Sequence, residues 1–555
     1  MKKLLEDVQW FLRKKIYMTA LLLTTICSYG FSYLHPVIGI DDTMTDQYFR
    51  VGRAPSMGRW TLFLLDKVLH FSDFAPFFLE VVGSILMVCG VLLFSVLYKR
   101  ILKSENSIVY TVFACIFVSF PFNAEDFLYY GHNGVGLGYV LTALALLFFA
   151  EAMDAGTGWR MRLKKLVIST LLLWVAVGCY ESFLILYAVA VLSFLVLRGF
   201  AEESRVTLRD VLSAVLTCFL VMLVVVVLRT LIIALINVLW DLQTLFPEEA
   251  RGFGEVRKLM QGEERGDNLF MLVKRYVLVY FINAVAFRPV RIYALSVLIF
   301  TILALILSIR RQNAWYVLLE LGMVICPFLL TLVEAKVTYY RTCQYMPLYA
   351  GLSFSLLLYL LQPEKEIGTA GRIRKGFYAL CVVGSFVLVF NQAELTNRIF
   401  YMDYCKYESV KEQLTQTALE IERDYGKNVP VIFTGTYEIP FDYIEDFYIP
   451  YGSREFAMIS RLTDWLDPHL KEKYYTPKGY TFAGEAQYGL ITWGFTAYDQ
   501  RSRQLVRFLE MHGHSFQVVT DEEVIDRAWE ISEGMPRWPQ TGSITQQDGY
   551  VLVHY

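Results

Sequence analysis

The sequence predicts a polytopic α-helical membrane protein with about eleven transmembrane helices and a C-terminal extracytoplasmic α/β domain. Hydrophobic residues make up 55% of the 555 residues and charged residues only 19%, which is typical of chains that cross a membrane repeatedly. Long apolar segments recur up to residue 393, and the composition then becomes markedly more polar. We therefore expect a membrane unit over residues 1–393 and a soluble unit over residues 394–555.

The first apolar segment, residues 16–34, is 19 residues long, which is enough to cross the hydrocarbon core as a helix. Basic residues precede it, and the positive-inside rule places them in the cytoplasm. They are Lys2, Lys3, Arg13, Lys14 and Lys15. The segment is too long for a cleavable signal peptide and lacks a small-residue cleavage site. We expect it to remain as a signal anchor with a cytoplasmic N-terminus.

Ten further apolar segments are candidate spans. They are residues 76–98, 107–121, 134–150, 166–180, 182–197, 211–236, 291–309, 314–333, 345–361 and 376–393. Basic clusters follow every second span, beginning with Lys99, Arg100 and Lys103, and all of them fall on the predicted cytoplasmic side. The odd number of spans then places the C-terminal unit outside the cytoplasm.

Residues 269–287 are also apolar, but Lys274 and Arg275 lie in the middle of this segment. Counting it as a span would move Arg310 and Arg311 to the outer side, against the positive-inside rule. We expect an amphipathic or re-entrant element on the outer face.

The C-terminal unit has a helical pattern over residues 404–425 and short apolar runs at 429–433, 516–519 and 550–553. Helices mixed with short buried strands predict a small α/β domain. The chain has nine cysteines but no CxxC pair, so the sequence supports neither a zinc site nor a disulfide framework. Its net charge of −2 gives no reason to expect nucleic acid as a partner.

An acidic pair, Asp41 and Asp42, follows the first span directly. Two adjacent carboxylates at a membrane surface are costly to hold near hydrocarbon, which favours a functional role over that of an ordinary hydrated loop. The remaining candidates occur in the other predicted outer loops or shortly after the pair. They are Arg53, Arg59, Glu125, Asp126, His132, Glu181, Lys336, Tyr340 and Arg341.

This mixture is what the transfer of a sugar from a phosphate carrier requires. A carboxylate takes the proton from the attacking hydroxyl, and arginines neutralise the departing phosphate through paired hydrogen bonds. No dedicated metal cage is present in the sequence, although clustered aspartates could hold Mg²⁺ or Mn²⁺ loosely. No cofactor is otherwise expected.

Three charged residues, Glu80, Arg229 and Glu320, lie inside predicted spans. The sequence leaves open whether Arg229 and Glu320 pair with helix backbones, pair with neighbours or line a cavity. A proton or ion relay would need several such residues at matched depth, and the sequence does not offer them.

Three motifs together resemble the bacterial Gtr-type membrane glucosyltransferases of the GT-C superfamily. They are Ile40-Asp41-Asp42 after the first span, Gly58-Arg59-Trp60, and Glu125-Asp126 in the second outer loop. The resemblance is clearest over residues 15–200. It implies a polyprenyl-phosphate sugar donor, most plausibly glucose on undecaprenyl phosphate, and a cell-surface glycan as acceptor. It also implies transfer at the outer face of the bacterial cytoplasmic membrane.

The resemblance assigns the essential acid of the first outer loop to Asp41 or Asp42, and the second acidic element to Glu125 and Asp126. Arg59 matches the Gly-Arg-Trp motif, and its chemistry suits a phosphate. Two alternatives remain: a transporter or flippase of a lipid-linked saccharide, and a membrane anchor that presents the C-terminal domain. The first would favour charges deep in the spans, and the second needs only one span.

Overall fold

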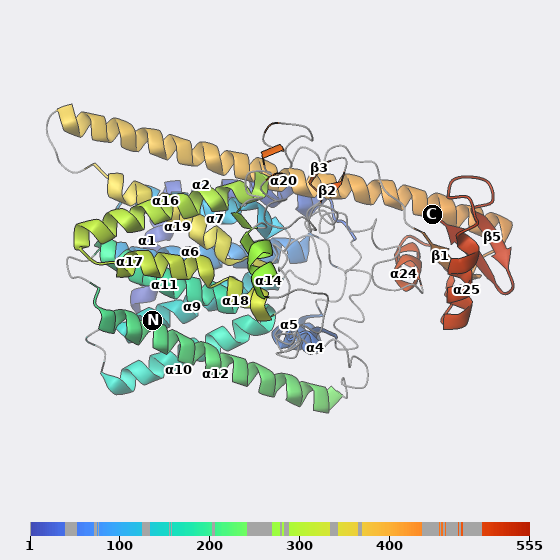
Figure 1. Cartoon of the computed structure of the whole chain (residues 1–555), viewed down its shortest axis with the longest axis horizontal. Coiled ribbons are helices and arrows are strands. Elements are labelled where there is room, and N and C mark those ends of the chain that lie inside the picture. Colours follow the sequence, from blue (N-terminus) through green and yellow to red (C-terminus); the bar gives the residue numbers. More distant parts are fainter. Residues whose placement is uncertain are drawn as a thin grey trace.

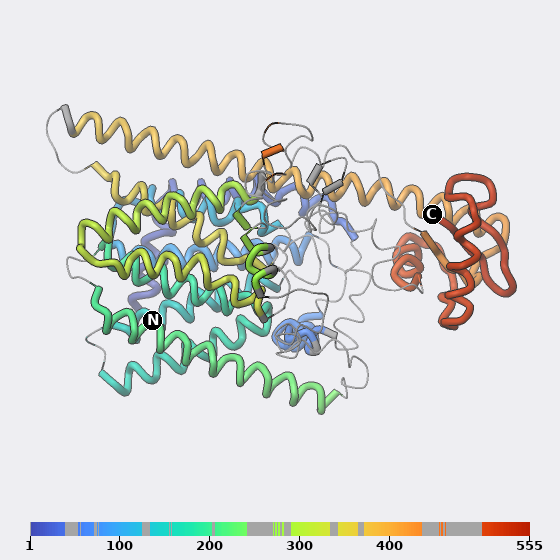
Figure 2. Tube along the Cα trace, viewed as in Figure 1, coloured from blue at the N-terminus to red at the C-terminus, as the bar shows by residue number. Residues whose placement is uncertain are grey.

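The computed structural model of the chain describes residues 2–38, 53–70, 75, 77–124, 134–154, 156, 158–201, 206–240, 269–277, 280–281, 288–333, 342–363, 369–435, 454, 457–458, 461, 475–476, 479–480 and 502–555. Within this part, a bundle of helices is joined by one long helix to a small α/β domain (Figures 1 and 2). The bundle therefore has two ends. We call the end facing the small domain the domain end, and the other the α1 end.

The helices of the first part of the bundle are α1 (Lys2–Arg13), α2 (Lys15–Leu34), α4 (Arg53–Ser56), α5 (Trp60–Leu69), α6 (Phe78–Leu102), α7 (Ser107–Ser119), the short 3₁₀ helix η2 (Pro121–Ala124), α9 (Val135–Met153), α10 (Trp159–Cys179), α11 (Phe183–Ala201) and α12 (Leu208–Trp240). The second part contains α14 (Leu269–Val277), α16 (Arg288–Arg311), α17 (Trp315–Ile325), α18 (Phe328–Val333), α19 (Tyr345–Leu361) and α20 (Thr369–Asp424).

Each of the eleven predicted segments falls on one of these helices, except that residues 314–333 form two helices. The break between α17 and α18 includes Pro327, whose ring and missing N–H prevent an unbroken helix. By length and composition, seven helical segments among the described residues could cross a membrane, with α17 and α18 counted together as one segment. The multi-pass character is therefore confirmed, while the count of eleven spans and their orientation stay predictions.

Helix α7 explains how a short segment fits into the bundle. It has 13 residues, fewer than the ~20 needed to cross a bilayer alone. Every residue from Val109 to Ser119 is buried, and α7 packs against α2, α19 and α20. Because protein surrounds it, its length does not have to match the hydrocarbon thickness.

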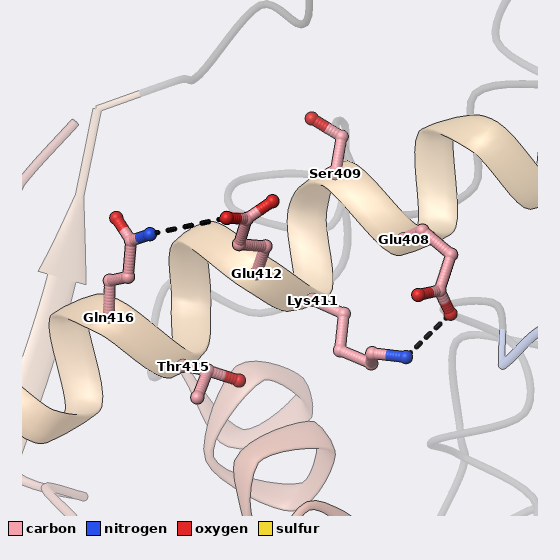
Figure 3. Close-up of a pocket in the computed structure, with 6 residues that line it drawn as sticks. All are labelled: Glu408, Ser409, Lys411, Glu412, Thr415 and Gln416. Carbon is pink, nitrogen blue, oxygen red and sulfur yellow. Dashed lines mark hydrogen bonds and ion pairs between the residues drawn. The ribbon is translucent and has the colours of Figure 1, made fainter.

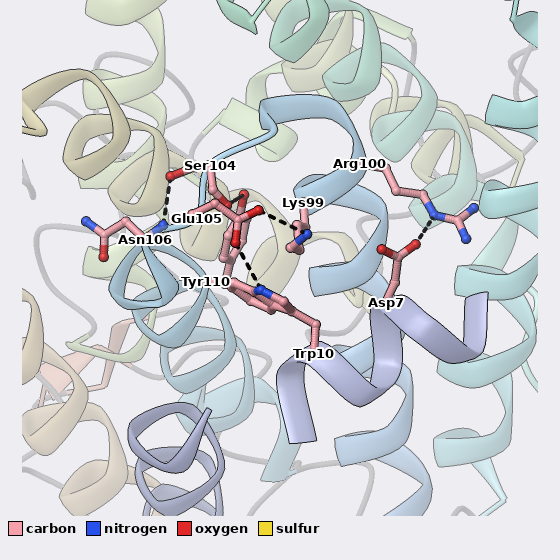
Figure 4. A network of polar contacts seen from close by, with 8 residues as sticks. All are labelled: Asp7, Trp10, Lys99, Arg100, Ser104, Glu105, Asn106 and Tyr110. Carbon is pink, nitrogen blue, oxygen red and sulfur yellow. Dashed lines mark hydrogen bonds and ion pairs between the residues drawn. The ribbon is translucent and has the colours of Figure 1, made fainter. Parts of the chain in front are cut away.

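A network of charged and aromatic side chains fixes α1 to the bundle (Figure 4). Arg100 on α6 donates from Nε to Asp7 at 2.7 Å and from Nη1 to Glu151 at 2.9 Å. Trp10 on α1 donates its indole N–H to Glu105 at 3.0 Å, and the Lys99 ammonium lies 4.6 Å from the Trp10 ring centroid. These contacts join α1, α6 and α9 at the α1 end.

The C-terminal domain contains a four-stranded sheet in the order β4-β1-β6-β5. Its strands are β1 (Pro430–Thr434), β4 (Gln517–Val518), β5 (Ile544–Gln547) and β6 (Tyr550–His554). β1 runs parallel to β4 and β6, whereas β5 is antiparallel to β6. The helices α24 (Arg503–Met511) and α25 (Glu522–Ser532) and the small hairpin of β2 (Tyr475–Thr476) and β3 (Gly479–Tyr480) complete the described elements. The three predicted strands are confirmed, and β5 was not predicted.

Helix α20 connects the bundle and the domain without a break. It has 56 residues, which corresponds to a length of roughly 84 Å at 1.5 Å per residue. The Tyr555 hydroxyl donates to Thr417 Oγ1 at 2.7 Å, and His514 Nδ1 lies 3.1 Å from a Glu422 carboxylate oxygen. The domain is thus held on the same helix that crosses the bundle. The predicted boundary at residue 393 falls inside this continuous helix and stays a prediction.

Within residues 269–287, the structure describes α14, of nine residues, and Tyr280 and Phe281. A helix of nine residues is too short to span a bilayer. Leu272 and Tyr276 are buried while Phe270 is exposed, so α14 has one protein-facing side.

Candidate functional site

Most of the predicted site residues lie outside the described part of the chain. These are Asp41, Asp42, Glu125, Asp126, His132, Lys336, Tyr340 and Arg341. Arg53 is described only for its backbone, as the first residue of α4. Two predicted residues, Arg59 and Glu181, are fully described, and the site is built from them.

The turn between α4 and α5 sets the position of Arg59. The Gly58 N–H donates to the Pro55 carbonyl and the Arg59 N–H to the Ala54 carbonyl, both at 2.8 Å. This pair of bonds is the Schellman pattern that ends a helix, with Gly58 in the left-handed region at φ +90°. The turn makes Arg59 the N-cap residue of α5.

The Arg59 side chain is buried, with 3% of its surface exposed. Its guanidinium carbon lies 4.4 Å from the centroid of the Tyr180 ring, a geometry in which the ring face attracts the cation. Tyr180 follows directly after α10. Arg59 therefore joins the start of α5 to the end of α10 at the domain end of the bundle (Figure 1).

Two further contacts fix α5 on α10. Thr61 Oγ1 donates to the Val175 carbonyl at 2.8 Å, and the Trp60 and Trp174 ring centroids are 4.6 Å apart. Gly178 permits this approach, because a Cβ there would lie 2.2 Å from Thr61 Oγ1. The guanidinium of Arg59 is thus held on a rigid support.

Glu181 lies in the three-residue turn between α10 and α11, next to Tyr180. Its neighbour Ser182 is buried and donates a hydrogen bond to Gln344, which precedes α19. Of the predicted site residues, the structure brings Arg59 and Glu181 to the same end of the bundle. Arg59 contacts the ring of Tyr180, and Glu181 is the next residue after Tyr180 in the chain.

Further buried polar residues at this end were missed by the sequence reasoning. The Tyr139 hydroxyl donates to Asn123 Oδ1 at 3.2 Å. Ser119 donates to Gln392 Oε1 at 3.1 Å, and Thr396 donates to the Ser119 carbonyl at 2.9 Å. The available signal was a polar residue near the end of an apolar segment, as with Gln392 in residues 376–393. These bonds join α9 to η2 and α7 to α20 at the domain end of the bundle.

A separate hollow lies on α20, lined by Glu408, Ser409, Lys411, Glu412, Thr415 and Gln416 (Figure 3). All six residues come from one helix, and Lys411 is paired with Glu408 at 2.5 Å. The hollow is open to its surroundings and brings no groups together from separate elements. We do not assign the transfer site to it.

Among the described residues, no group of three or more His, Cys, Asp or Glu side chains could hold a metal ion. The predicted acidic pairs lie outside this part of the chain, so the expectation of loosely held Mg²⁺ or Mn²⁺ stays untested.

Comparison with known proteins gives one family and one solved structure. The family model described as Glucosyl transferase GtrII matches residues 30–359, more than half of the chain. The archaeal oligosaccharyltransferase AglB from Archaeoglobus fulgidus, solved with an inhibitory peptide and a dolichol-phosphate, aligns with a TM-score of 0.37 and 9% identity. The alignment covers 76% of this chain and 63% of that one, less than two thirds of its length. No curated protein gives a significant match.

Proposed function

The chain belongs to the glucosyl transferase GtrII family, and from this premise we propose that it moves glucose from a polyprenyl-phosphate donor to a cell-surface glycan. It is a multi-pass membrane glucosyltransferase. We further propose a GT-C-type enzyme that acts at the outer face of the cytoplasmic membrane, which is then the domain end of the bundle. The family match carries the proposal, because residues 30–359 include both acidic pairs and Arg59.

In the proposed reaction, a hydroxyl of the acceptor glycan attacks the anomeric carbon of the glucose. Asp41 or Asp42 takes the hydroxyl proton as general base, and the other acid orients it or binds the acceptor. The bond between the anomeric carbon and the phosphate oxygen breaks, and the electron pair leaves with the polyprenyl phosphate. Glu125 and Asp126 form the second acidic element of the proposed site.

Arg59 has the role of neutralising the phosphate. The guanidinium is planar and can offer two parallel bonds to phosphate oxygens, and its contact with the Tyr180 ring fixes its orientation. Burial of Arg59 supports this role, because electrostatic attraction is stronger away from bulk water. We also propose roles in substrate and phosphate binding for Arg53, His132, Glu181, Lys336, Tyr340 and Arg341.

The C-terminal domain, residues 394–555 in the proposed division, is suited to contact the acceptor. Helix α20 holds it at the domain end (Figure 1), where Arg59 and the polar contacts around Ser119 lie. A polymer bound by the domain would therefore approach the bundle from the side of the proposed site.

The test uses purified protein in sealed vesicles that contain undecaprenyl-phosphate glucose with a radioactive sugar, with the glycan acceptor added outside. The proposal predicts label in the glycan, and no label without acceptor or without protein. Movement of the labelled lipid between leaflets without transfer would support the flippase instead. A protein without its C-terminal domain that still transfers to a soluble acceptor would restrict the domain to acceptor binding.

A further inference from the structure

Arg229 lies close to the turn that positions Arg59, although 170 residues separate them in the chain. It belongs to α12, and its Nη2 lies 3.5 Å from the Met57 carbonyl oxygen, a long hydrogen bond. A Cβ on Gly58 would lie 1.7 Å from Arg229 Nη2. The guanidinium therefore fills the space that a side chain at residue 58 would occupy.

Three hydrogen-bond donors in this region have no acceptor in the part of the chain that the structure describes. They are Nε of Arg229 and the indole N–H groups of Trp60 and Trp174. All three atoms are shielded from solvent, and only 5% of Trp60 is exposed. Leaving a buried donor without an acceptor is destabilising, and more so when the group is charged. These donors come from α5, α10 and α12, and a ligand with several acceptor atoms would supply what each of them lacks.

The position of α12 makes the region accessible from the bilayer. Only 28% of the most apolar stretch of this helix is buried. Val227 and Leu231, on either side of Arg229, are exposed. The helix packs on α10 and α4. At its end, the ring centroids of Trp240 and of Phe63 on α5 lie 5.5 Å apart. A ligand that reaches Arg229 along α12 therefore has an apolar part in the membrane and a polar head at the domain end (Figure 1).

We propose that Arg229, with the indole N–H groups of Trp60 and Trp174, binds the phosphate of the carrier lipid beside Arg59. The ligand class is a lipid phosphate, because it combines an anion with an apolar chain. No acidic side chain among the described residues pairs with Arg229. This proposal rests on the proposed function, since it assigns a residue to the carrier of that reaction.

A second arginine has a specific use in the proposed reaction. The sugar-linked phosphate is a diester with one negative charge, whereas the departing phosphate monoester carries about −1.5 to −2 at pH 7, as phosphorylated side chains do. A cation that meets the charge as it develops lowers the barrier to departure. Arg59 is matched to the charge of the donor, and Arg229 to the charge that appears when the bond breaks.

The test compares Arg229→Gln with Arg209→Gln in the full-length protein. Both variants remove one arginine from α12, but Arg209 is exposed near the other end of the helix, about 30 Å away at 1.5 Å per residue. Binding is measured by native mass spectrometry and by thermal shift with two probes, undecaprenyl phosphate and phosphatidylglycerol. Thermal unfolding without lipid reports folding of each variant.

We expect Arg229→Gln to weaken undecaprenyl phosphate binding roughly 10- to 100-fold, the range for a hydrogen bond to a charged group. Arg209→Gln should bind as wild type does, and phosphatidylglycerol binding should be equal in all three proteins. Trp60→Phe, which keeps an aromatic ring but removes the indole N–H, should weaken carrier binding by a smaller factor.

Unchanged carrier binding in a folded Arg229→Gln variant would overturn the assignment. A loss confined to phosphatidylglycerol would also overturn it and would assign the region to a structural phospholipid. Neither result would affect the proposed function, which fails separately if wild-type protein transfers no sugar from any lipid-linked donor.

Discussion

Replacement of Gly58 by alanine tests how the turn before Arg59 is built. The substitution places a Cβ 1.7 Å from Arg229 Nη2 and 2.5 Å from its Cζ, and it forces a non-glycine residue to φ +90°. The left-handed backbone costs about 1–2 kcal/mol. Overpacking in a closed space adds about 1–3 kcal/mol if the guanidinium does not move. We expect Gly58→Ala to lower the free energy of unfolding by about 1–5 kcal/mol, with the lower end if the Arg229 guanidinium swings aside and the upper end if it stays in place.

A double-mutant cycle separates the two contributions. In the double variant Gly58→Ala/Arg229→Ala the clash is absent, so Gly58→Ala adds only its backbone cost to the effect of Arg229→Ala. The double variant should therefore be more stable than the sum of the two single effects predicts. The coupling should be about 1–3 kcal/mol. Thermal unfolding in detergent, followed by tryptophan fluorescence, gives the four stabilities. Strict additivity would refute the argument that Arg229 is held in the space beside Gly58.

Two more predictions concern buried polar groups. Glu320 accepts hydrogen bonds from Thr301 at 2.9 Å and Tyr349 at 2.7 Å, so Glu320→Leu should lower the free energy of unfolding by about 1–3 kcal/mol. Glu320→Gln keeps an acceptor and should lower it by less in the same unfolding assay. Equal losses for the two variants would contradict this prediction. Burial, reinforced by the positive charge of Arg537, lowers the pKa of His554 from its usual 6.5. The unfolded chain then binds the proton more readily, so this contribution to domain stability is complete above about pH 6.5 and is lost as the pH falls toward the lower folded pKa. Unfolding between about pH 5 and 7 should show this loss in wild type and not in His554→Gln; identical pH profiles would contradict it.

Much of the bundle could be predicted because apolar length and period are local properties of the sequence. The segments 16–34 and 182–197, for example, coincide with α2 and α11. The three predicted strands of the C-terminal domain were recognised in the same way, from short apolar runs. Strand β5, Ile544–Gln547, reads Ile-Thr-Gln-Gln and lacks such a run, so its pairing with β6 was not visible.

The continuity of α20 was missed for a different reason. Composition changes near residue 393, and this change was interpreted as a boundary. A helix can pass from lipid to water without interruption, however, when its exposed side chains change from apolar to charged, as they do between Phe390 and Glu412. Composition reports the surroundings of a helix and does not locate its end.

The site could be predicted only in part, because contacts between distant residues leave little trace in one sequence. Arg59 was singled out from its motif, but its contact with Tyr180 depends on how α5 meets α10. The lone Arg229 in an apolar segment and the glycine before Arg59 were each visible, while the contact between them was not. Because Gly58 and Arg229 are far apart in the sequence, neither residue alone predicts that the two are in contact.

The central claim is that the acidic pair after α2 acts in glucosyl transfer. The direct measurement compares wild type, Asp41→Asn, Asp42→Asn and the double variant in transfer of labelled glucose from undecaprenyl phosphate to glycan. A matched Asp46→Asn variant removes a nearby carboxylate outside the proposed pair. The account predicts that the double variant loses transfer while it inserts and unfolds as wild type does, with Asp46→Asn active. Normal transfer by both single variants and by the double variant would contradict it.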